Sequence, residues 1–354
     1  MERRLDGIDG LRGIAIALVV AYHSWLVYGC CAGLISEAGF LGVELFFALS
    51  GFCIFYPYAS AQLSGAAPPS WAAYSYRRAI KIVPSYVLAL SVFALAYARR
   101  DGLEPTATAY LAHMFFIHPL IARAFQAISG PLWTIGIEVQ FYFIFPLLCG
   151  FFLRRPLAVA AVVLLVAGGY RLAVLSTHPD PGFFLSNQVI AFLDLFAAGM
   201  LAAYVVAWVR TRYEQAAIQR AATPIALVAI AAAAVGMFAF AHSAAMNDSA
   251  AFFVWQMQWR SAIAGLLFVM VTSTVLALPG MRRLIANPAS TFLAIISYNL
   301  YLWHLEILSL AQRVQLPFIF ALLAALAVGA AATYLVERPL LRARLKRLDI
   351  VLTP

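Results

Sequence analysis

The sequence predicts an all-α fold, a polytopic integral-membrane bundle of about ten transmembrane helices. Of its 354 residues, 64% are hydrophobic and only 11% are charged, and the mean hydropathy is +0.89. Apolar runs of about 20 residues recur along the chain, which is the length a helix needs to cross a bilayer. Proline, glycine and arginine mark the breaks between these runs, as is typical of turns outside the hydrocarbon.

The apolar runs give the ten predicted helices in order. They cover residues 8–29, 39–58, 79–98, 132–153, 156–176, 188–209, 223–242, 260–279, 291–311 and 316–336. Residues 110–121 form a shorter apolar stretch, which is too short to span and predicts an interfacial or re-entrant segment. Little sequence remains outside the helices, so we expect one integral-membrane domain over residues 1–354.

The positions of the basic residues predict the orientation. If the amino terminus is cytoplasmic, every cytoplasmic segment carries arginine or lysine, as the positive-inside rule requires. The far side and its helix ends then hold the other basic residues: Arg99, Arg100, Arg123, Arg171, Arg260 and Arg313. Ten helices place both termini in the cytoplasm. This pattern also accounts for the net charge of +9, which therefore does not indicate nucleic-acid binding.

The first predicted helix contains two residues that are unusual in an apolar run, Arg12 and His23. They are eleven positions apart, so at ~100° per residue they share one face, and at ~1.5 Å per residue they are about 16 Å apart. An ionisable residue inside a membrane helix is a functional hypothesis by default. Taken alone, the pair is as compatible with a structural role, in which the arginine snorkels and the histidine bonds within a helix interface, as it is with a functional site.

Further ionisable residues fall at a similar predicted depth, in the outer third of the bilayer. They are His23, Glu44, Glu138, Asp194 and His304, with Glu306 nearer the surface. Each side chain alone could make a structural hydrogen bond between helices, but together the five favour a functional site. A second group lies at the predicted inner face: Asp6, Asp9, Arg12, Arg77, Arg78, Lys81, Glu337 and Arg338. Its arginines could bind a phosphorylated ligand or contact lipid headgroups.

The chemistry that these residues could perform follows from their types. A histidine suits general-base work on a hydroxyl, and a carboxylate such as Glu138 could orient its ring. Ser50 is a weak candidate nucleophile, because nothing in the sequence assigns it a base. The chain has no metal-ligand spacing, no Gly-rich phosphate loop and no G-x-S-x-G motif, so no metal is expected.

Six short motifs follow one another along the chain. The first is residues 5–15 through His23, with the Arg-x10-His spacing. The others are residues 39–52, 76–84, 130–142, 296–304 and 337–339. In this order they resemble the motifs of acyltransferase family 3, multi-pass membrane proteins that acylate sugars and other acceptors. They extend over nearly the whole chain, so the resemblance does not depend on one short pattern. The extra hydrolase-like domain of some members is not expected, and the chain resembles a stand-alone membrane domain.

The resemblance implies a membrane-bound O-acyltransferase of the bacterial inner membrane. The donor would be acyl-CoA, usually acetyl-CoA, bound from the cytoplasm. The acceptor would be a hydroxyl of a cell-envelope or lipid-linked glycan, such as a polysaccharide or lipopolysaccharide. His23, Arg12 and Glu138 carry over as the catalytic residues, with His23 either a general base or a transiently acylated group. The expected substrate-binding residues are Arg77, Arg78, Lys81, Glu44, Trp133, Tyr298 and His304.

Two positions depart from the family pattern. Glu44 stands where aspartate is common, which keeps the charge on a longer arm. Lys81 stands where an arginine often closes the basic motif, so bidentate phosphate contact is not expected there.

An alternative function is a proton-coupled transporter or flippase, since intramembrane His and carboxylates also relay protons. The sequence shows no paired broken helices or evident halves to favour it. A third possibility is a structural or lipid-scaffold membrane protein.

Overall fold

The computed structural model describes residues 6–29, 33–98, 107–243 and 248–343. Over these ranges it contains helices and no strand. Ten of the helices are long and apolar enough to cross a membrane. The predicted all-α class and the predicted number of spans are therefore confirmed.

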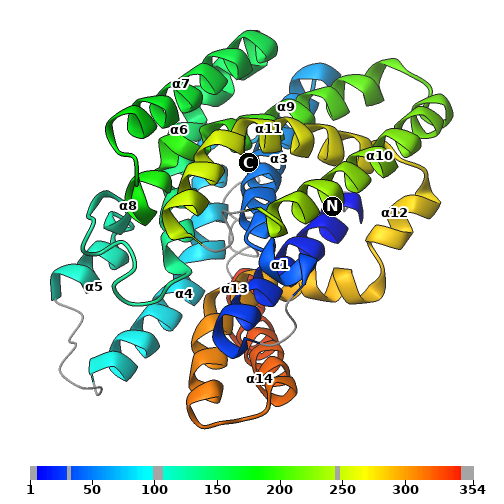
Figure 1. Cartoon of the computed structure of the whole chain (residues 1–354). Helices are drawn as coiled ribbons and strands as arrows, with labels where there is room; N and C mark the ends of the chain where they lie inside the picture. Colours follow the sequence, from blue (N-terminus) through cyan, green and yellow to red (C-terminus); the bar gives the residue numbers. More distant parts are fainter. Residues whose placement is uncertain (1–5, 30–32, 99–106, 244–247, 344–354) are drawn as a thin grey trace. The chain divides into compact units, whose positions relative to one another are not determined.

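The long helices follow the predicted order (Figure 1). They are α1 (Asp6–Tyr28), α3 (Leu41–Ser64), α4 (Trp71–Ala98), α6 (Leu132–Arg154), α7 (Pro156–Thr177), α9 (Val189–Arg212), α10 (Gln215–Ala241), α11 (Ser249–Leu276), α13 (Pro288–Arg313) and α14 (Phe318–Ala331). A π-helical segment, η3 (Ala332–Glu337), continues α14. The short helices are α2 (Leu34–Glu37), α5 (Ala107–Met114), η1 (His118–Leu120), α8 (Gly182–Ser186) and α12 (Pro279–Ile285). The predicted non-spanning stretch at 110–121 corresponds to α5 and η1.

Some helices begin well before their apolar runs. The start of α11 is residue 249, whereas hydropathy places it at 260, because Asp248 caps the helix there. The Asp248 Oδ1 accepts hydrogen bonds from the amides of Ala250 and Ala251 at 2.8 and 3.2 Å, which satisfies donors that a helix start otherwise leaves unpaired. The consequence is that Arg260 lies inside α11 and not at its end.

The chain packs as two compact units. The larger unit comprises the described parts of residues 6–25, 33–68 and 137–294, and the smaller unit those of 26–29, 69–136 and 295–343. Each unit is assembled from segments far apart in sequence, and α1, α6 and α13 contribute residues to both.

In the larger unit, α3 packs against α9, which also contacts α7 and α11, while α10 runs beside α11 (Figure 1). The backbones of α3 and α9 approach so closely that a Cβ at Gly199 would lie 1.8 Å from the carbonyl oxygen of Ala48. Aromatic rings pack around this crossing, and those of Phe141 and Phe196 stack with centroids 3.9 Å apart. Small residues that let backbones approach are typical of helix packing in membranes.

In the smaller unit, α4 contacts α5 and η3. Phe93 of α4 lies edge-on to Trp303 of α13, with ring centroids 5.0 Å apart. Leu308 and Ala311 of α13 form a buried cluster with Ala321 of α14. These contacts join α4, α13 and α14.

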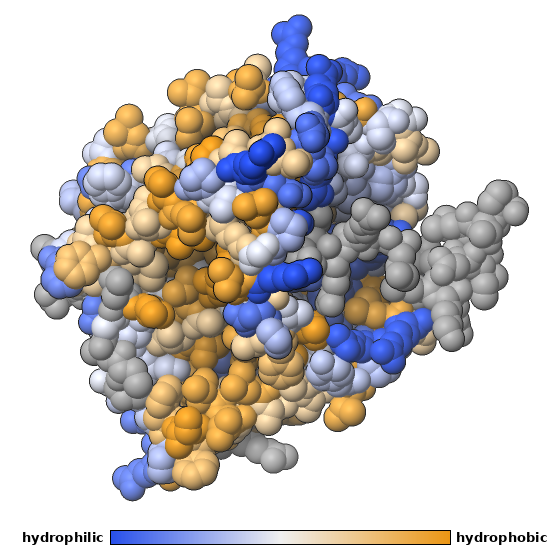
Figure 2. Space-filling view, turned by 90° about the vertical axis from the view of Figure 1, so that its right-hand side faces the viewer, coloured by the Kyte–Doolittle hydropathy of each residue, from blue (hydrophilic) through white to orange (hydrophobic). Residues whose placement is uncertain are grey.

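Large apolar side chains cover much of the outside of both units. Phe143 is 83% exposed and Leu165 73% exposed, and the face in Figure 2 shows broad hydrophobic areas with separate hydrophilic patches. Apolar surface of this extent is what a bilayer would cover. The chain is therefore a multi-pass membrane protein.

Candidate active site

Arg12 and His23 both lie on α1, which is uninterrupted over residues 6–28. The predicted spacing of about 16 Å along one helical face therefore holds. Both side chains are half-buried. The helix is anchored in the larger unit near Arg12, because a Cβ at Gly13 would lie 2.1 Å from the carbonyl oxygen of Ser290. Only glycine allows this approach.

The ring of His23 is oriented by its own helix. Its Nδ1 lies 3.0 Å from the carbonyl oxygen of Val19, and because a carbonyl only accepts, Nδ1 carries the proton. In the neutral ring Nε2 is then the basic nitrogen. Tyr22 packs edge-on against the ring, with centroids 5.3 Å apart. This tautomer suits His23 to accept a proton at Nε2.

Glu138 of α6 forms a cluster with two hydroxyl groups. The hydroxyl of Ser50, on α3, donates to its Oε1. The hydroxyl of Tyr142, one turn further along α6, donates to the same oxygen at 2.5 Å. The described hydrogen bonds of this carboxylate go to Ser50 and Tyr142, and the expected role of Glu138 in orienting the ring of His23 stays a prediction. The three polar side chains, Ser50, Glu138 and Tyr142, are called the hydroxyl–carboxylate cluster below.

Glu44 is neutralised inside the protein. Its Oε1 accepts from Nε of Arg260 at 3.3 Å, and both side chains are buried. Arg260 also donates to the carbonyl oxygen of Ser186 at 2.8 Å and lies 3.9 Å from the centroid of the Phe192 ring. The topology prediction treated Arg260 as a helix-end charge, and that placement is wrong because α11 begins earlier. The pair gives Glu44 a structural role, and its predicted contact with substrate stays a prediction.

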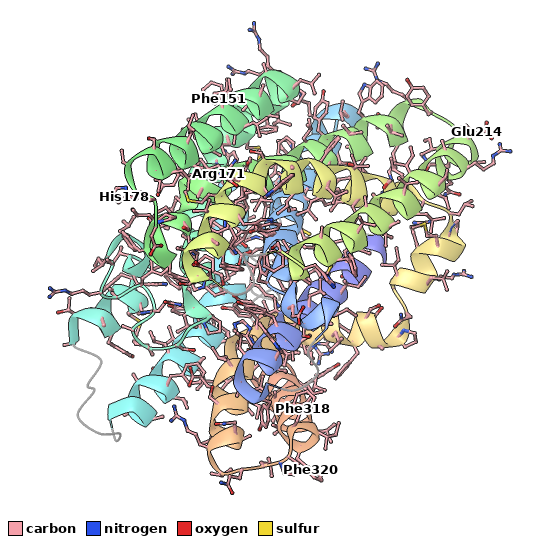
Figure 3. All side chains as sticks on the ribbon, in the orientation of Figure 1. Phe151, Arg171, His178, Glu214, Phe318 and Phe320 are labelled. Carbon is pink, nitrogen blue, oxygen red and sulfur yellow. The ribbon has the colours of Figure 1, made fainter. Side chains whose placement is uncertain are left out.

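A second buried ion pair joins α7 to α9. Arg171 bonds both carboxylate oxygens of Asp194, at 3.2 and 2.6 Å. Ser261 of α11 donates to Asp194 Oδ2 at 2.9 Å. Figure 3 shows Arg171 on the inner side of the helices, whereas Glu214 lies outside at the turn after α9. Two carboxylates of the predicted polar layer, Glu44 and Asp194, therefore have arginine partners that sequence reasoning missed. The sequence does contain a signal for these pairs, because Arg171 and Arg260 fall at a predicted depth in the bilayer from which their side chains can reach the two carboxylates.

The basic motif of α4 lies in the smaller unit. Lys81 forms an ion pair with Glu337 of η3, and Glu337 also accepts from Asn299 of α13 at 2.7 Å. Tyr298 donates to the carbonyl oxygen of Ile82 at 2.8 Å. Lys81 and Tyr298 thus join α4, α13 and η3. Of the other residues in the predicted inner-face group, Arg77 is exposed and Arg78 is half-buried, while the side chain of Asp6 lies outside the described residues.

The remaining predicted binding residues, Trp133 and His304, also lie in the smaller unit. Trp133 stacks on Phe125 with ring centroids 5.8 Å apart. His304 is fully buried, and its Nδ1 lies 2.8 Å from the carbonyl oxygen of Tyr301. Their roles in binding stay predictions.

A histidine pair that the sequence did not single out lies outside the candidate spans. His113 of α5 and His118 of η1 stack with ring centroids 3.9 Å apart. Tyr86 lies 3.2 Å from His113 Nδ1, and His113 Nε2 donates to the carbonyl oxygen of Ala124 at 2.9 Å. Burial lowers the pKa of His113 to about 4. Burial, together with the neighbouring His113, lowers the pKa of His118 to about 3. Both rings are neutral at physiological pH.

Among the described residues, no group of three or more His, Cys, Asp or Glu side chains could hold a metal ion. The polar groups of the larger unit are instead bases, hydroxyls and paired charges. Such groups support proton transfer and nucleophilic attack by hydroxyls.

Comparison with known proteins identifies a family. The model of acyltransferase family 3, described as an acyltransferase domain, matches residues 5–337. The peptidoglycan O-acetyltransferase OatA of Listeria monocytogenes is 25% identical over 350 residues, which are 88% of this chain and 51% of the relative. The O-acetyltransferase OatA of Staphylococcus aureus (strain NCTC 8325) is 29% identical over 169 residues, 43% of this chain and 26% of the relative.

This chain therefore spans a quarter to a half of the length of these relatives. No solved structure matches it.

Proposed function

We propose that this chain, which belongs to acyltransferase family 3, is a membrane-bound O-acyltransferase that transfers an acyl group, such as acetyl, to a hydroxyl of a cell-envelope glycan. The observation that carries the proposal is the placement of Arg12 and His23 on one face of the uninterrupted α1, within a family match over residues 5–337. The O-acetyltransferase relatives support the reaction class and a glycan acceptor.

The proposed donor is an acyl-CoA thioester that enters from the cytoplasm, with both termini on that side of the bacterial inner membrane. Its phosphates need cationic partners. Arg12 forms no ion pair among the described residues, and Arg77 is exposed. Within the smaller unit we assign donor binding to Arg77 and Arg78, since guanidinium groups match phosphate oxygens. Arg12 of the larger unit is proposed separately as a phosphate-binding cation.

His23 is the proposed general base. Its Nε2 removes the proton from the acceptor hydroxyl while that oxygen attacks the acyl carbon. The Nδ1 hydrogen bond to Val19 holds the ring in the required tautomer, and general-base catalysis of this kind contributes about 10²–10⁴-fold to a rate. The acceptor class is a polysaccharide, a lipopolysaccharide or a lipid-linked sugar.

Replacement of the α1 pair tests the activity. We expect His23→Ala and Arg12→Ala to insert at wild-type levels and to abolish O-acetylation, measured by mass spectrometry of envelope glycans from a deletion strain carrying each variant. Arg220→Ala, at an exposed arginine of α10, is the matched control and should restore wild-type acetylation. Retention of acetylation by His23→Ala would contradict the assignment.

The donor is tested by thermal unfolding of the purified protein with CoA. We expect CoA to raise the melting temperature, and Arg78→Gln to reduce that shift. No shift at any CoA concentration would favour the alternative transporter or flippase function.

A further inference from the structure

Ser50, Glu138 and Tyr142 form the hydroxyl–carboxylate cluster inside two candidate spans of the larger unit. Ser50 donates to Glu138 Oε1 across the contact between α3 and α6, and Tyr142 donates to the same oxygen. All three side chains are half-buried. The structure thus provides Ser50 with the carboxylate partner that its sequence neighbourhood does not reveal.

Glu138 differs from the carboxylates of the helices that form ion pairs. Glu44 and Asp194 each face an arginine, and Glu337 faces Lys81. Glu138 has no cation partner among the described residues, and its described hydrogen bonds use Oε1 alone. A structural carboxylate in a membrane helix normally has its charge compensated, so an uncompensated one indicates a functional group.

The position of Glu138 on α6 excludes simple exposure to lipid. Phe143, which is 83% exposed, marks the outward face of this helix. Glu138 precedes it by five residues, which turns the carboxylate about 140° away around the helix. Its partial exposure is therefore toward the protein interior.

The backbone beneath Ser50 is held firmly. Two residues earlier, Ala48 packs against Gly199 so closely that a Cβ there would lie 1.8 Å from the Ala48 carbonyl oxygen. On the other helix, Phe141 stacks on Phe196 of α9. Both partners of the hydrogen bond are thus fixed against the same helix, and a hydroxyl in fixed hydrogen-bond contact with a carboxylate is the arrangement of an activated nucleophile.

We propose that Ser50 carries the acyl group as an ester between the donor and the acceptor, with Glu138 as the base for its formation. This deepens the proposed O-acyltransfer and rests on it. The Ser50 oxygen attacks the thioester carbonyl carbon, the new C–O bond forms and the C–S bond breaks. Glu138 takes the hydroxyl proton and passes it to the departing CoA thiolate, so the products are acyl-Ser50 and CoA thiol.

In the second half, the acceptor hydroxyl attacks the carbonyl carbon of acyl-Ser50. The acceptor's proton is removed by His23, as proposed above, and an equivalent proton restores the Ser50 hydroxyl. The sum is one thioester and one alcohol converted to one ester and one thiol. Tyr142 is a positioning residue that holds the Glu138 carboxylate.

Trapping of the ester tests the proposal. The purified full chain in detergent is incubated with radiolabelled acetyl-CoA without acceptor, quenched in acid and digested for mass spectrometry. We expect an acetyl mass on the peptide that contains Ser50, released by hydroxylamine at alkaline pH. Ser50→Ala should lose the label and lower glycan acetylation in cells about 100-fold or more.

Two further variants keep the result interpretable. Ser50→Cys preserves a nucleophile of similar size, and we expect a thioester there, which neutral hydroxylamine releases. Ser273→Ala is the matched control, because among the described residues the Ser273 hydroxyl bonds only the backbone of its own helix, at Val269 and Met270. It should retain the label and the acetylation.

Wild-type transfer without label on Ser50, or Ser50→Ala with wild-type transfer, would overturn the proposed acyl-Ser50 ester and leave the O-acyltransferase function intact. Absence of label together with no CoA-dependent melting shift and no acetyl transfer would overturn both proposals.

Discussion

Arg260 and Glu44 form a buried ion pair between α11 and α3, with Nε and Oε1 3.3 Å apart. The guanidinium group also lies 3.9 Å from the centre of the Phe192 ring, so both an ionic and a cation–π contact hold it. Desolvation makes such a pair costly to build, and removal of one partner leaves a buried charge.

Arg260→Met should therefore destabilise the larger unit strongly, by about 3–5 kcal/mol. The double variant Glu44→Leu/Arg260→Met removes both charges and should recover most of that loss. Thermal unfolding of the purified variants in detergent measures both. If the two single substitutions, Glu44→Leu and Arg260→Met, simply add in the double variant, the charges are not coupled.

Gly199→Ala should disrupt the crossing of α3 and α9, because the added methyl group would lie 1.8 Å from the Ala48 carbonyl oxygen. Overpacking of this kind costs about 1–3 kcal/mol or more. Gly236→Ala is the matched control, since nothing lies within 4 Å of a Cβ there. It should leave the melting temperature unchanged or raised, because alanine favours helix. An equal effect of both substitutions would contradict the close crossing.

Acid should destabilise the smaller unit through His113 and His118. Their pKa values, about 4 and about 3, lie below the usual value of 6.5, so the folded state favours the neutral rings. The stability that they contribute is present above about pH 6.5 and is lost as the pH falls toward their folded pKa values. The loss is on the order of 2 kcal/mol per histidine near pH 4.5.

The measurement is the melting temperature between pH 7.5 and about 4.5. The double variant His113→Gln/His118→Gln should show a smaller acid-induced decrease than the wild type. His242→Gln, at an exposed histidine, should retain the full decrease. An unchanged decrease in the double variant would assign the acid sensitivity to other groups.

Lys81 and Arg78 should differ in their effects although they belong to one motif. Lys81 is paired with Glu337, so Lys81→Met should lower stability and change CoA binding little. Arg78→Gln should weaken CoA binding, since it removes a proposed phosphate contact. Melting temperatures with and without CoA separate the two effects. A Lys81→Met variant that keeps its stability but loses the CoA-dependent shift would reverse these assignments.

The sequence predicts the helices well because each span must be about 20 apolar residues long. The predicted helix boundaries are wrong where a helix begins with polar residues. Hydropathy begins α11 at residue 260, but the Asp248 cap starts it at 249, so Arg260 becomes an interior residue. Capping bonds are local and could have been read from Asp248 and the following residues.

The candidate site was predicted only in its residue types. The arginine–histidine spacing on α1 follows from helix geometry alone. Which hydroxyl meets Glu138, or which arginine meets Glu44, depends on how helices far apart in sequence pack together. Depth along the bilayer brings several partners within range, and rotation of each helix about its axis selects among them. Periodicity does not determine that rotation between two helices.

The two intramembrane ion pairs differ in how soon during synthesis they can form. Arg171 and Asp194 are 23 residues apart, on consecutive long helices, so a hairpin can insert with its charges already matched. Glu44 and Arg260 are 216 residues apart. A lone charge costs an inserting helix about 2.5–3.5 kcal/mol at its centre and less toward its ends, and Glu44 lies in the first turn of α3. Glu44 of α3 therefore has no arginine partner until α11 has left the ribosome. The larger unit can reach its final packing only in the last part of translation.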